Sequence, residues 1–300
     1  MLFSRCAGSP IDPAPGDLRV RSIKKGMKRH MKKTTWLFVS LLIVLAIGVS
    51  NATAQHIQPS GETIGFDKQG NAIYQVRANG IEIGYTLIGS GEPLVMIMGL
   101  GGTMDHWPRE VIEALSKKYQ LIMPDNRGMG YTKANDATFT TKLFADDVIG
   151  LLNALNVKKA NVLGFSMGSM ITQELLLEYP QRLNKAIVYA TSTDGSNVVA
   201  TLKGKTPNDP TVLRQIEATT HWKTPLDKLP SIKNQVMFIV GTSDTVVGVE
   251  SSKTLASAIP GAWLVQFKNG SHGLMIEAPT EFAKIVLDFL DINETVGVKQ

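Results

Sequence analysis

The sequence has almost no cysteine, because Cys6 is its one thiol in 300 residues. The rest of the chain therefore has no disulfide, no thiol nucleophile and no cysteine-ligated zinc site. A chain of this length can bury a large hydrophobic core, so it can fold without such cross-links.

A strong charge of one sign is also missing once the first 54 residues are set aside. The full chain has a formal charge of +5, but nine of its 31 Lys and Arg residues and two of its 26 Asp and Glu residues lie in residues 1–54. The remainder holds 22 basic and 24 acidic residues, a formal charge of about −2. This balance gives no reason to expect nucleic acid as a partner.

The long hydrophobic run near the N-terminus, Trp36–Val49, has 14 residues, which is short of the roughly 20 that span a bilayer. Basic residues from Lys28 to Lys33 precede it, and the small-x-small pattern Ala52-Thr53-Ala54 follows it. This layout is typical of a secretory signal peptide cleaved near Ala54. An uncleaved membrane anchor is the less favoured alternative.

These features predict three segments. Residues 1–26 are expected to be a non-native or disordered leader, and residues 27–54 a signal peptide. Residues 55–300 are expected to form one folded domain that is secreted or periplasmic. The sequence does not indicate an oligomeric state.

The pattern of the folded part predicts a sheet covered by helices. Two alternating runs flank Asn79-Gly80 within residues 72–93, which predicts a hairpin. Continuous apolar runs, typical of parallel strands buried on both faces, then follow at Leu94–Met98, Leu121–Met123, Val162–Leu163, Ala186–Tyr189, Val236–Val240 and Leu264–Phe267.

Helical patterns alternate with these runs. They lie at Trp107–Leu115 with Asp105 as the N-cap, at Leu143–Leu155, Met170–Leu177, Val249–Ile259 and Phe282–Leu290. Strand–helix alternation predicts an α/β fold with a doubly wound, mostly parallel sheet. The polar interval 193–235 is too long for a simple loop, so it is expected to be a short lid with a helix at Thr211–Thr220.

Ser166 lies between two glycines in Gly164-Phe165-Ser166-Met167-Gly168, where a predicted strand meets a predicted helix. Ligands bind beyond the carboxyl ends of parallel strands, and a sharp turn there would point the hydroxyl into the cleft. We therefore expect Ser166 to be a nucleophile. The alternative is a tight turn in which the serine only caps the helix.

A serine nucleophile needs a base, and His272 is the best-placed histidine. It follows the last apolar run, between Gly270 and Gly273, at the same end of the sheet as Ser166. His106, after the first covered strand, and His221, in the lid, are placed less well. The alternative is a structural or surface histidine.

The histidine in turn needs an acceptor that fixes its tautomer. Asp244 lies just past the strand before the one that leads to His272, and is the favoured acid. Asp194 is the second choice, and Glu277 is too close to His272 in the sequence to be preferred. Asp244 could instead be a turn or cap residue.

Two backbone N–H groups are expected to form an oxyanion hole. One is that of Met167, directly after the nucleophile. The other belongs to the glycine-rich turn 98–103, with Leu100 as the predicted donor. The alternative is a flexible glycine loop.

With these residues the chain resembles the α/β-hydrolase superfamily, in particular its small esterase-like, cofactor-free peroxidase-like and iminopeptidase-like branch. The likeness covers about Gly80 to Leu290, and its motifs occur in family order. They are MGLGGTMDHW, PDNRGMGYT, GFSMGS, GTSDTVV and GSHGLM. The order Ser166, Asp244, His272 is that of nucleophile, acid and base in the family, and Asp125, Arg127 and Gly128 match a turn taken as structural.

The chain departs from the family at Met98-Gly99, because the family often has His-Gly before the oxyanion residue, so the bracing contacts of that histidine should be lost. Serine at position 166, where dehalogenases and epoxide hydrolases have aspartate, argues against those two chemistries. The resemblance implies a serine hydrolase of carboxylic esters, or of thioesters, lactones or amides, that acts on small molecules without metal or organic cofactor, and the predicted signal peptide implies that it is secreted. Alternatives are a cofactor-free perhydrolase or haloperoxidase, and a receptor-like binding protein with little turnover.

Overall fold

The computed structural model describes residues 56–202, 204 and 208–292. All described residues belong to one compact unit. The predicted leader, signal peptide and cleavage site lie outside the described residues. Among the residues that the structure describes, no helix has the length and apolarity needed to cross a membrane.

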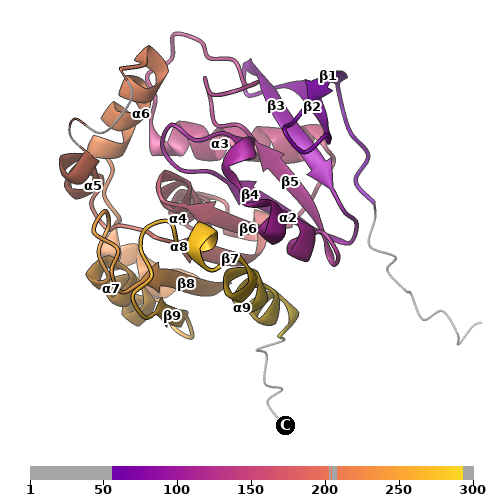
Figure 1. The fold of residues 1–300 in the computed structure, drawn as a ribbon. Coiled ribbons are helices and arrows are strands. Elements are labelled where there is room, and N and C mark those ends of the chain that lie inside the picture. Colours follow the sequence, from indigo (N-terminus) through magenta and orange to yellow (C-terminus); the bar gives the residue numbers. More distant parts are fainter. Residues whose placement is uncertain (1–55, 203, 205–207, 293–300) are drawn as a thin grey trace, which may run out of the picture. The chain divides into compact units, whose positions relative to one another are not determined.

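A nine-stranded sheet runs through the described part of the chain in the order β1-β2-β3-β5-β4-β6-β7-β8-β9 (Figure 1). Strands β4 to β9 pair in parallel, and β1 to β3 are antiparallel to their neighbours. The strands are β1 (Glu62–Phe66), β2 (Ala72–Ala78), β3 (Ile81–Ile88), β4 (Glu92–Ile97), β5 (Tyr119–Pro124), β6 (Ala160–Phe165), β7 (Leu183–Tyr189), β8 (Gln235–Gly241) and β9 (Trp263–Phe267).

The central strands are buried on both faces, which explains their continuous apolar runs. In β4, Leu94 and Met96 pack into one core, whereas Val95 and Ile97 pack into the other. The same alternation continues along β6, β7 and β8. Successive side chains of a strand point to opposite faces, so each strand contributes to both cores.

Helices cover both faces of the sheet. They are α2 (Arg109–Leu115), α3 (Thr141–Ala154), α4 (Met167–Glu178), α5 (Gly195–Leu202), α6 (Pro210–Thr220), α7 (Glu250–Ala258), α8 (Leu274–Glu277) and α9 (Pro279–Asp291). One core contains residues of α2, α8 and α9, and the other contains residues of α3, α4 and α7. Figure 1 shows α2 and α9 on the near side of the sheet. The predicted doubly wound, mostly parallel sheet is confirmed.

The predicted hairpin is also confirmed, because Ala78 pairs with Ile81 across Asn79 and Gly80, which both have positive φ. The predicted cap at Asp105 is wrong. A 3-10 turn, Met104–His106, comes first, and α2 begins only at Arg109 after Pro108 at the N-cap position. Proline has no N–H to donate and clashes with a preceding helical turn, so one helix cannot run through Pro108.

The described residues of the interval predicted as a lid form two α-helices and a 3-10 helix. The predicted helix is present as α6, whose N-cap is Asp209. The sequence pattern missed α5, and it missed the 3-10 helix at Leu226–Ser231. In Figure 1, α5 and α6 lie together beside one end of the sheet.

Candidate active site

Ser166 occupies the single residue between β6 and α4, in a strained backbone conformation. Its φ and ψ are 54° and −117°, a region that residues with a side chain rarely adopt. A Cβ atom added at Gly164 would lie 2.2 Å from the carbonyl oxygen of Gly168, and one added at Gly168 would lie 2.2 Å from that of Ile97. Both positions therefore require glycine for this turn to form.

The structure does not support the alternative in which the Ser166 side chain caps the helix. Its side chain makes no capping hydrogen bond, although the residue stands at the N-cap of α4. Its Oγ instead lies 3.0 Å from Nε2 of His272. The residue is only 7% exposed, so it is almost completely buried.

The three candidate residues Ser166, His272 and Asp244 lie together at the carboxyl ends of the strands. His272 Nδ1 lies 2.8 Å from Oδ2 of Asp244, and its Nε2 faces the serine. The Asp244 side chain is fully buried, and that of His272 is 22% exposed. The partners are separated by 106 and 28 residues in the sequence, so the fold alone brings them together.

The surroundings of Asp244 favour its charged form. Burial alone would raise the pKa of this carboxyl, but the His272 ring and the backbone N–H groups of Val246 and Val247 outweigh it and lower the pKa. A carboxylate can only accept hydrogen bonds, so the proton of the shared contact belongs to Nδ1 of His272. In that tautomer Nε2 has a free lone pair, which can accept the Ser166 hydroxyl proton.

Tyr189, at the end of β7, contacts both the serine and the histidine segments. Its carbonyl oxygen accepts from the backbone N–H of Ser166 at 3.0 Å, and its hydroxyl donates to the carbonyl oxygen of His272 at 2.7 Å. The same hydroxyl accepts from the N–H of Met275 at 3.2 Å. The ring stacks on Phe165 with centroids 4.9 Å apart. Sequence reasoning missed Tyr189, because a buried tyrosine in an apolar strand carries no motif.

The glycine-rich turn after β4 lies directly against the serine. A Cβ atom added at Gly99 would lie 3.0 Å from Cβ of Ser166. The N–H of Met167 is the first of α4, and neither it nor the N–H of Leu100 has a hydrogen-bond acceptor among the described residues. The Met167 N–H directly follows the serine and the Leu100 N–H lies in the turn that contacts it, and an oxyanion hole needs two such unpaired donors.

Hydrogen bonds to the loop after β5 hold the glycine-rich turn in place. The backbone N–H of Met104 donates to Oδ1 of Asp125 at 2.7 Å, and Asn126 donates to the carbonyl oxygen of Met98 at 2.8 Å. The second oxygen of Asp125 accepts from the N–H of Tyr131. These contacts brace the turn even though Met98 stands where the family often has histidine. Burial, opposed by the two N–H donors, raises the pKa of Asp125 to about 6.

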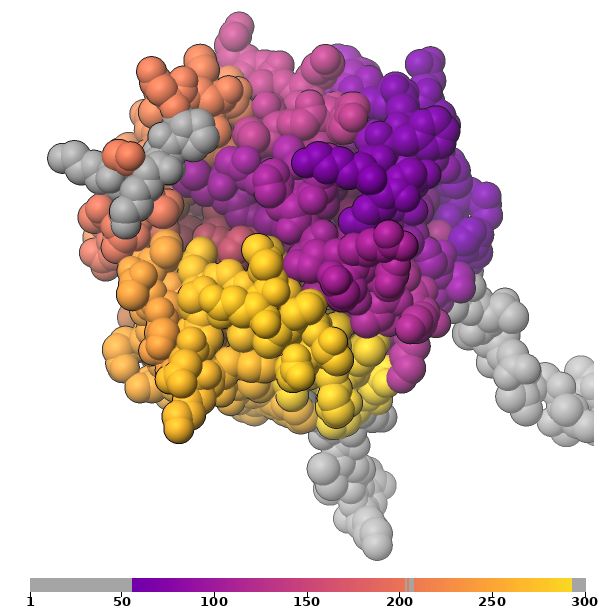
Figure 2. Space-filling model, viewed as in Figure 1, coloured from indigo at the N-terminus to yellow at the C-terminus, as the bar shows by residue number. Residues whose placement is uncertain are grey.

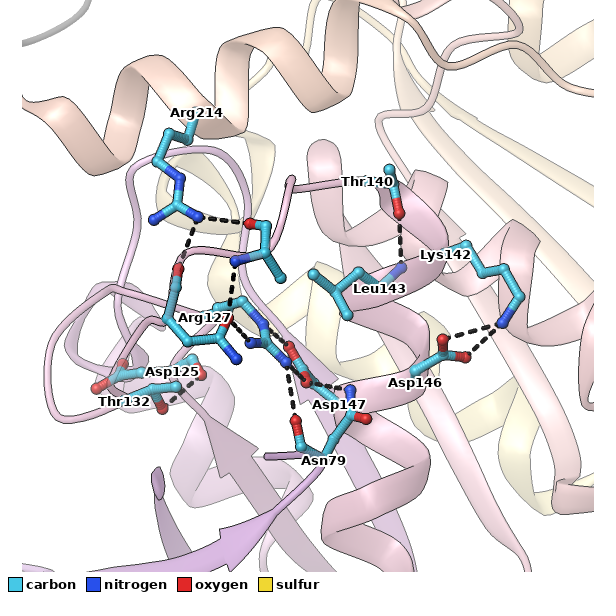
Figure 3. Close-up of polar contacts among 12 residues, drawn as sticks. Asn79, Asp125, Arg127, Thr132, Thr140, Lys142, Leu143, Asp146, Asp147 and Arg214 are labelled. Atoms are coloured by element: carbon cyan, nitrogen blue, oxygen red, sulfur yellow. Dashed lines mark hydrogen bonds and ion pairs between the residues drawn. The ribbon is translucent and has the colours of Figure 1, made fainter. Parts of the chain in front are cut away.

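Arg127, in the same loop, is fully buried and forms two hydrogen bonds with Asp147 of α3. It also donates to Asn135 and to the carbonyl oxygen of Asn79 in the β2–β3 hairpin (Figure 3). Burial raises the pKa of Asp147, and the Arg127 guanidinium and the Asn79 amide oppose this rise. These contacts support the structural role that the sequence predicted for this turn.

The competing candidates are engaged elsewhere. Asp194 forms an ion pair with Lys223 and accepts from Ser196, and Glu277 accepts from the N–H and hydroxyl of Ser271. The ring of His106 contacts Thr103, and Nδ1 of His221 lies 2.8 Å from the carbonyl oxygen of Glu217 in α6. Within residues 56–202, 204 and 208–292, no cluster of three or more His, Cys, Asp or Glu side chains could hold a metal ion.

Figure 2 shows the molecule from the side of α8 and α9. The yellow segment that follows His272 borders the purple and magenta segments that contain the glycine-rich turn and the loop after β5. Three regions that are far apart in the sequence therefore share one surface of the domain.

Comparison with known proteins agrees with this geometry. A family model described as the alpha/beta hydrolase fold matches residues 92–216. A protein of Mycobacterium tuberculosis provisionally named non-heme bromoperoxidase BpoC is 38% identical over 112 residues. That match covers 37% of this chain and 42% of the relative, so the chain spans about two fifths of the length of this relative.

Longer matches are less identical. The 2-hydroxymuconate semialdehyde hydrolase of Pseudomonas sp. is 25% identical over 265 residues, which cover 72% of this chain and 93% of that enzyme. The crystal structure of a hydrolase from Pseudomonas aeruginosa superposes with a TM-score of 0.63 at 25% identity, and covers 73% of this chain and 98% of its own. These likenesses show the alpha/beta hydrolase fold and support a hydrolase enzyme, and the chain is similar to members of the α/β-hydrolase superfamily.

Proposed function

We propose that the protein is a serine hydrolase that cleaves small carboxylic esters through an acyl-enzyme, with Ser166 as nucleophile, His272 as base and Asp244 as acid. The observation that carries this proposal is the chain of two contacts, 3.0 Å from Ser166 to His272 and 2.8 Å from His272 to Asp244. Thioesters, lactones and amides share the reacting carbonyl group, so they form the wider substrate class.

In the first half of the reaction, Nε2 of His272 takes the proton of the Ser166 hydroxyl as the oxygen attacks the ester carbonyl. The carbonyl oxygen becomes an anion, which the N–H groups of Leu100 and Met167 stabilise. The carboxylate of Asp244 stabilises the imidazolium formed at this step. His272 then gives its proton to the departing alcohol, which leaves an ester bond between the acyl group and Ser166.

In the second half, water takes the place of the alcohol. Nε2 of His272 removes one proton from the water as its oxygen attacks the acyl carbonyl, and the same N–H groups hold the second oxyanion. Collapse of this intermediate releases the carboxylic acid and returns the proton to Ser166. Each proton taken is given back, so no further reactant is needed.

A chromogenic ester tests the proposal. Ser166→Ala and His272→Ala should each lower kcat by about 10⁴-fold or more. His221→Ala is the matched control, because Nδ1 of its ring lies against the carbonyl oxygen of Glu217 in its own helix, and it should leave kcat within about twofold. Substantial activity in the Ser166→Ala protein would disprove the assignment.

A second candidate function is favoured by the relative named a non-heme bromoperoxidase. In that reaction hydrogen peroxide, in place of water, would attack the acyl group on Ser166 and form a peracid. Peracid formed from acetate and peroxide, at a rate above that of ester hydrolysis, would favour this function. A stoichiometric release of alcohol with negligible turnover would favour the receptor-like alternative.

Export is proposed separately, on the signal-peptide pattern of residues 27–54 alone. Expression of the full chain in a bacterial host, followed by N-terminal sequencing of the periplasmic or secreted protein, should find a start near Gln55. Retention of the uncleaved chain in the cytoplasm would contradict export.

A further inference from the structure

The lid helix α6 makes a direct hydrogen bond to the glycine-rich turn. Oε1 of Gln215 accepts from the backbone N–H of Gly101 at 2.8 Å, across 114 residues of sequence. The side chain of Gln215 is fully buried. Gly101 follows Leu100, the proposed oxyanion donor, so the contact fixes the peptide next to that N–H group.

This bond completes a set of contacts that leaves Leu100 free. The N–H of Gly102 donates to the carbonyl oxygen of Gly99, that of Thr103 to the His106 ring, and that of Met104 to Asp125. With Gln215 bound to Gly101, every N–H group from residue 101 to 104 has an acceptor. The N–H of Leu100 is the one in this run that remains available to a substrate.

The position of α6 is fixed independently of Gln215. Arg214 donates to the carbonyl oxygens of Asn135 and Ala137, and its guanidinium lies 3.7 Å from the centroid of the Phe139 ring. Figure 3 shows this arginine reaching from the helix to the loop that follows Arg127. On the neighbouring turn of α6, Val212 lies against Gly101, because a Cβ atom added at Gly101 would be 3.6 Å from Cγ2 of Val212. The helix therefore holds Gln215 at a fixed place above the turn.

The nitrogen of the Gln215 amide indicates that hydrophobic packing does not explain why a glutamine stands at this position. Its Nε2 is buried and has no hydrogen-bond partner in the described structure. Leaving a buried donor unpaired costs about 1–3 kcal/mol, which a methionine or leucine of similar size would avoid. A polar side chain at this place is thus explained by what its oxygen does.

We propose that Gln215 is a positioning residue of the oxyanion hole, by which the lid helix orients the Leu100 N–H toward the substrate. The inference rests on the proposed serine-hydrolase function. Oxyanion donors act only within about 2.7–3.1 Å of the developing charge, and loss of one donor costs about 10²–10³ in kcat. Because Gln215 acts through the turn, its loss should cost less, about 10- to 100-fold.

The test compares Gln215→Met with Thr219→Val. Thr219 lies one turn further along α6, is equally buried, and its hydroxyl also has no partner, so it is a matched control for loss of a buried polar atom. Gln215→Met should lower kcat for a chromogenic ester about 10- to 100-fold with KM within about twofold. It should weaken a boronic acid inhibitor, whose serine adduct carries an oxyanion, by a similar factor. Thr219→Val should change none of these.

Hydrogen exchange at the Gly101 amide gives a readout that does not depend on activity. It should be faster in Gln215→Met than in the wild type. If that variant does not fold, Gln215→Glu replaces it, because the carboxylate keeps an acceptor for Gly101 but adds charge near the oxyanion. Its kcat relative to the wild type should fall as pH rises and the carboxyl ionises.

Two failures are distinguishable. A wild type that cleaves esters, with kcat unchanged in Gln215→Met, would overturn the role of Gln215 and leave the proposed function intact. A wild type that cleaves no ester would overturn the proposed function, and with it the oxyanion role of Gln215.

Discussion

The hydroxyl of Tyr189 offers a single-atom test of how His272, the proposed base, is held. Tyr189→Phe removes the donor to the carbonyl oxygen of His272, at 2.7 Å, and the acceptor of the Met275 N–H, at 3.2 Å. The ring contacts with Phe165 and Phe282, at 4.9 and 4.8 Å, are retained. The substitution therefore loosens the histidine segment without creating a large cavity.

The magnitude follows from the two lost bonds. Each hydrogen bond contributes about 0.5–1.5 kcal/mol net, so unfolding should become easier by about 2 kcal/mol. About 1.4 kcal/mol corresponds to a factor of ten in rate. If the bond to the His272 carbonyl is what holds the imidazole facing Ser166, kcat should fall about tenfold while KM stays within about twofold.

Tyr85→Phe is the matched control, because this tyrosine is equally buried and makes the same pair of bonds elsewhere. Its hydroxyl donates to the carbonyl oxygen of Ser60 at 2.7 Å and accepts from the N–H of Ser60 at 2.8 Å. Urea unfolding should give similar losses of stability for both variants, and only Tyr189→Phe should lose kcat. Equal kcat in the two variants, at equal loss of stability, would refute the reasoning.

Three further predictions concern the acid, the glycine turn and pH. Asp244→Asn should lower kcat for an ester about 10⁴-fold, because the histidine would adopt the wrong tautomer, whereas Asp194→Asn should leave kcat within about twofold. A large loss of kcat in Asp194→Asn with a small loss in Asp244→Asn would reassign the acid to Asp194. Gly164→Ala should destabilise the fold by about 3 kcal/mol or more in urea unfolding, because the added Cβ would lie 2.2 Å from a backbone carbonyl oxygen and from a threonine hydroxyl. Gly273→Ala, in which the nearest contact of the added Cβ would be 3.8 Å, should be nearly neutral, and equal effects of the two substitutions would contradict this account of the turn. Burial raises the pKa of Asp125 to about 6 from 3.8, so the folded state binds this proton more tightly than the unfolded state does. The unfolding free energy should therefore fall by about 2 kcal/mol as pH rises from 4 to 6, relative to Asp125→Asn, and equal pH dependence in the two proteins would count against this reasoning.

Much of the fold could be predicted from the sequence because its signals are local. Strands buried on both faces must be apolar throughout, so β4 and β8 stand out as continuous runs. The glycines at 164 and 168 are required by the backbone around Ser166, so the turn is visible as a short motif. The N-cap of α2 was misplaced because Asp105 is a good cap by type, while the constraint came from Pro108.

The side chains that hold the site could not be predicted in the same way. Gln215 meets Gly101 across 114 residues, and Tyr189 meets His272 across 83. Neither contact leaves a periodicity or a spacing in the sequence, because each depends on which elements pack together in space. The short helix α5 was missed for a related reason, since Gly195 and Ser196 at its start are weak helix formers.

The most direct test of the central claim is labelling of the folded protein with a fluorophosphonate, followed by peptide mapping. The account predicts one label per chain, on Ser166, that forms rapidly in the wild type and much more slowly in the His272→Ala protein. A label that maps to another residue, or a folded wild type that remains unlabelled, would contradict it.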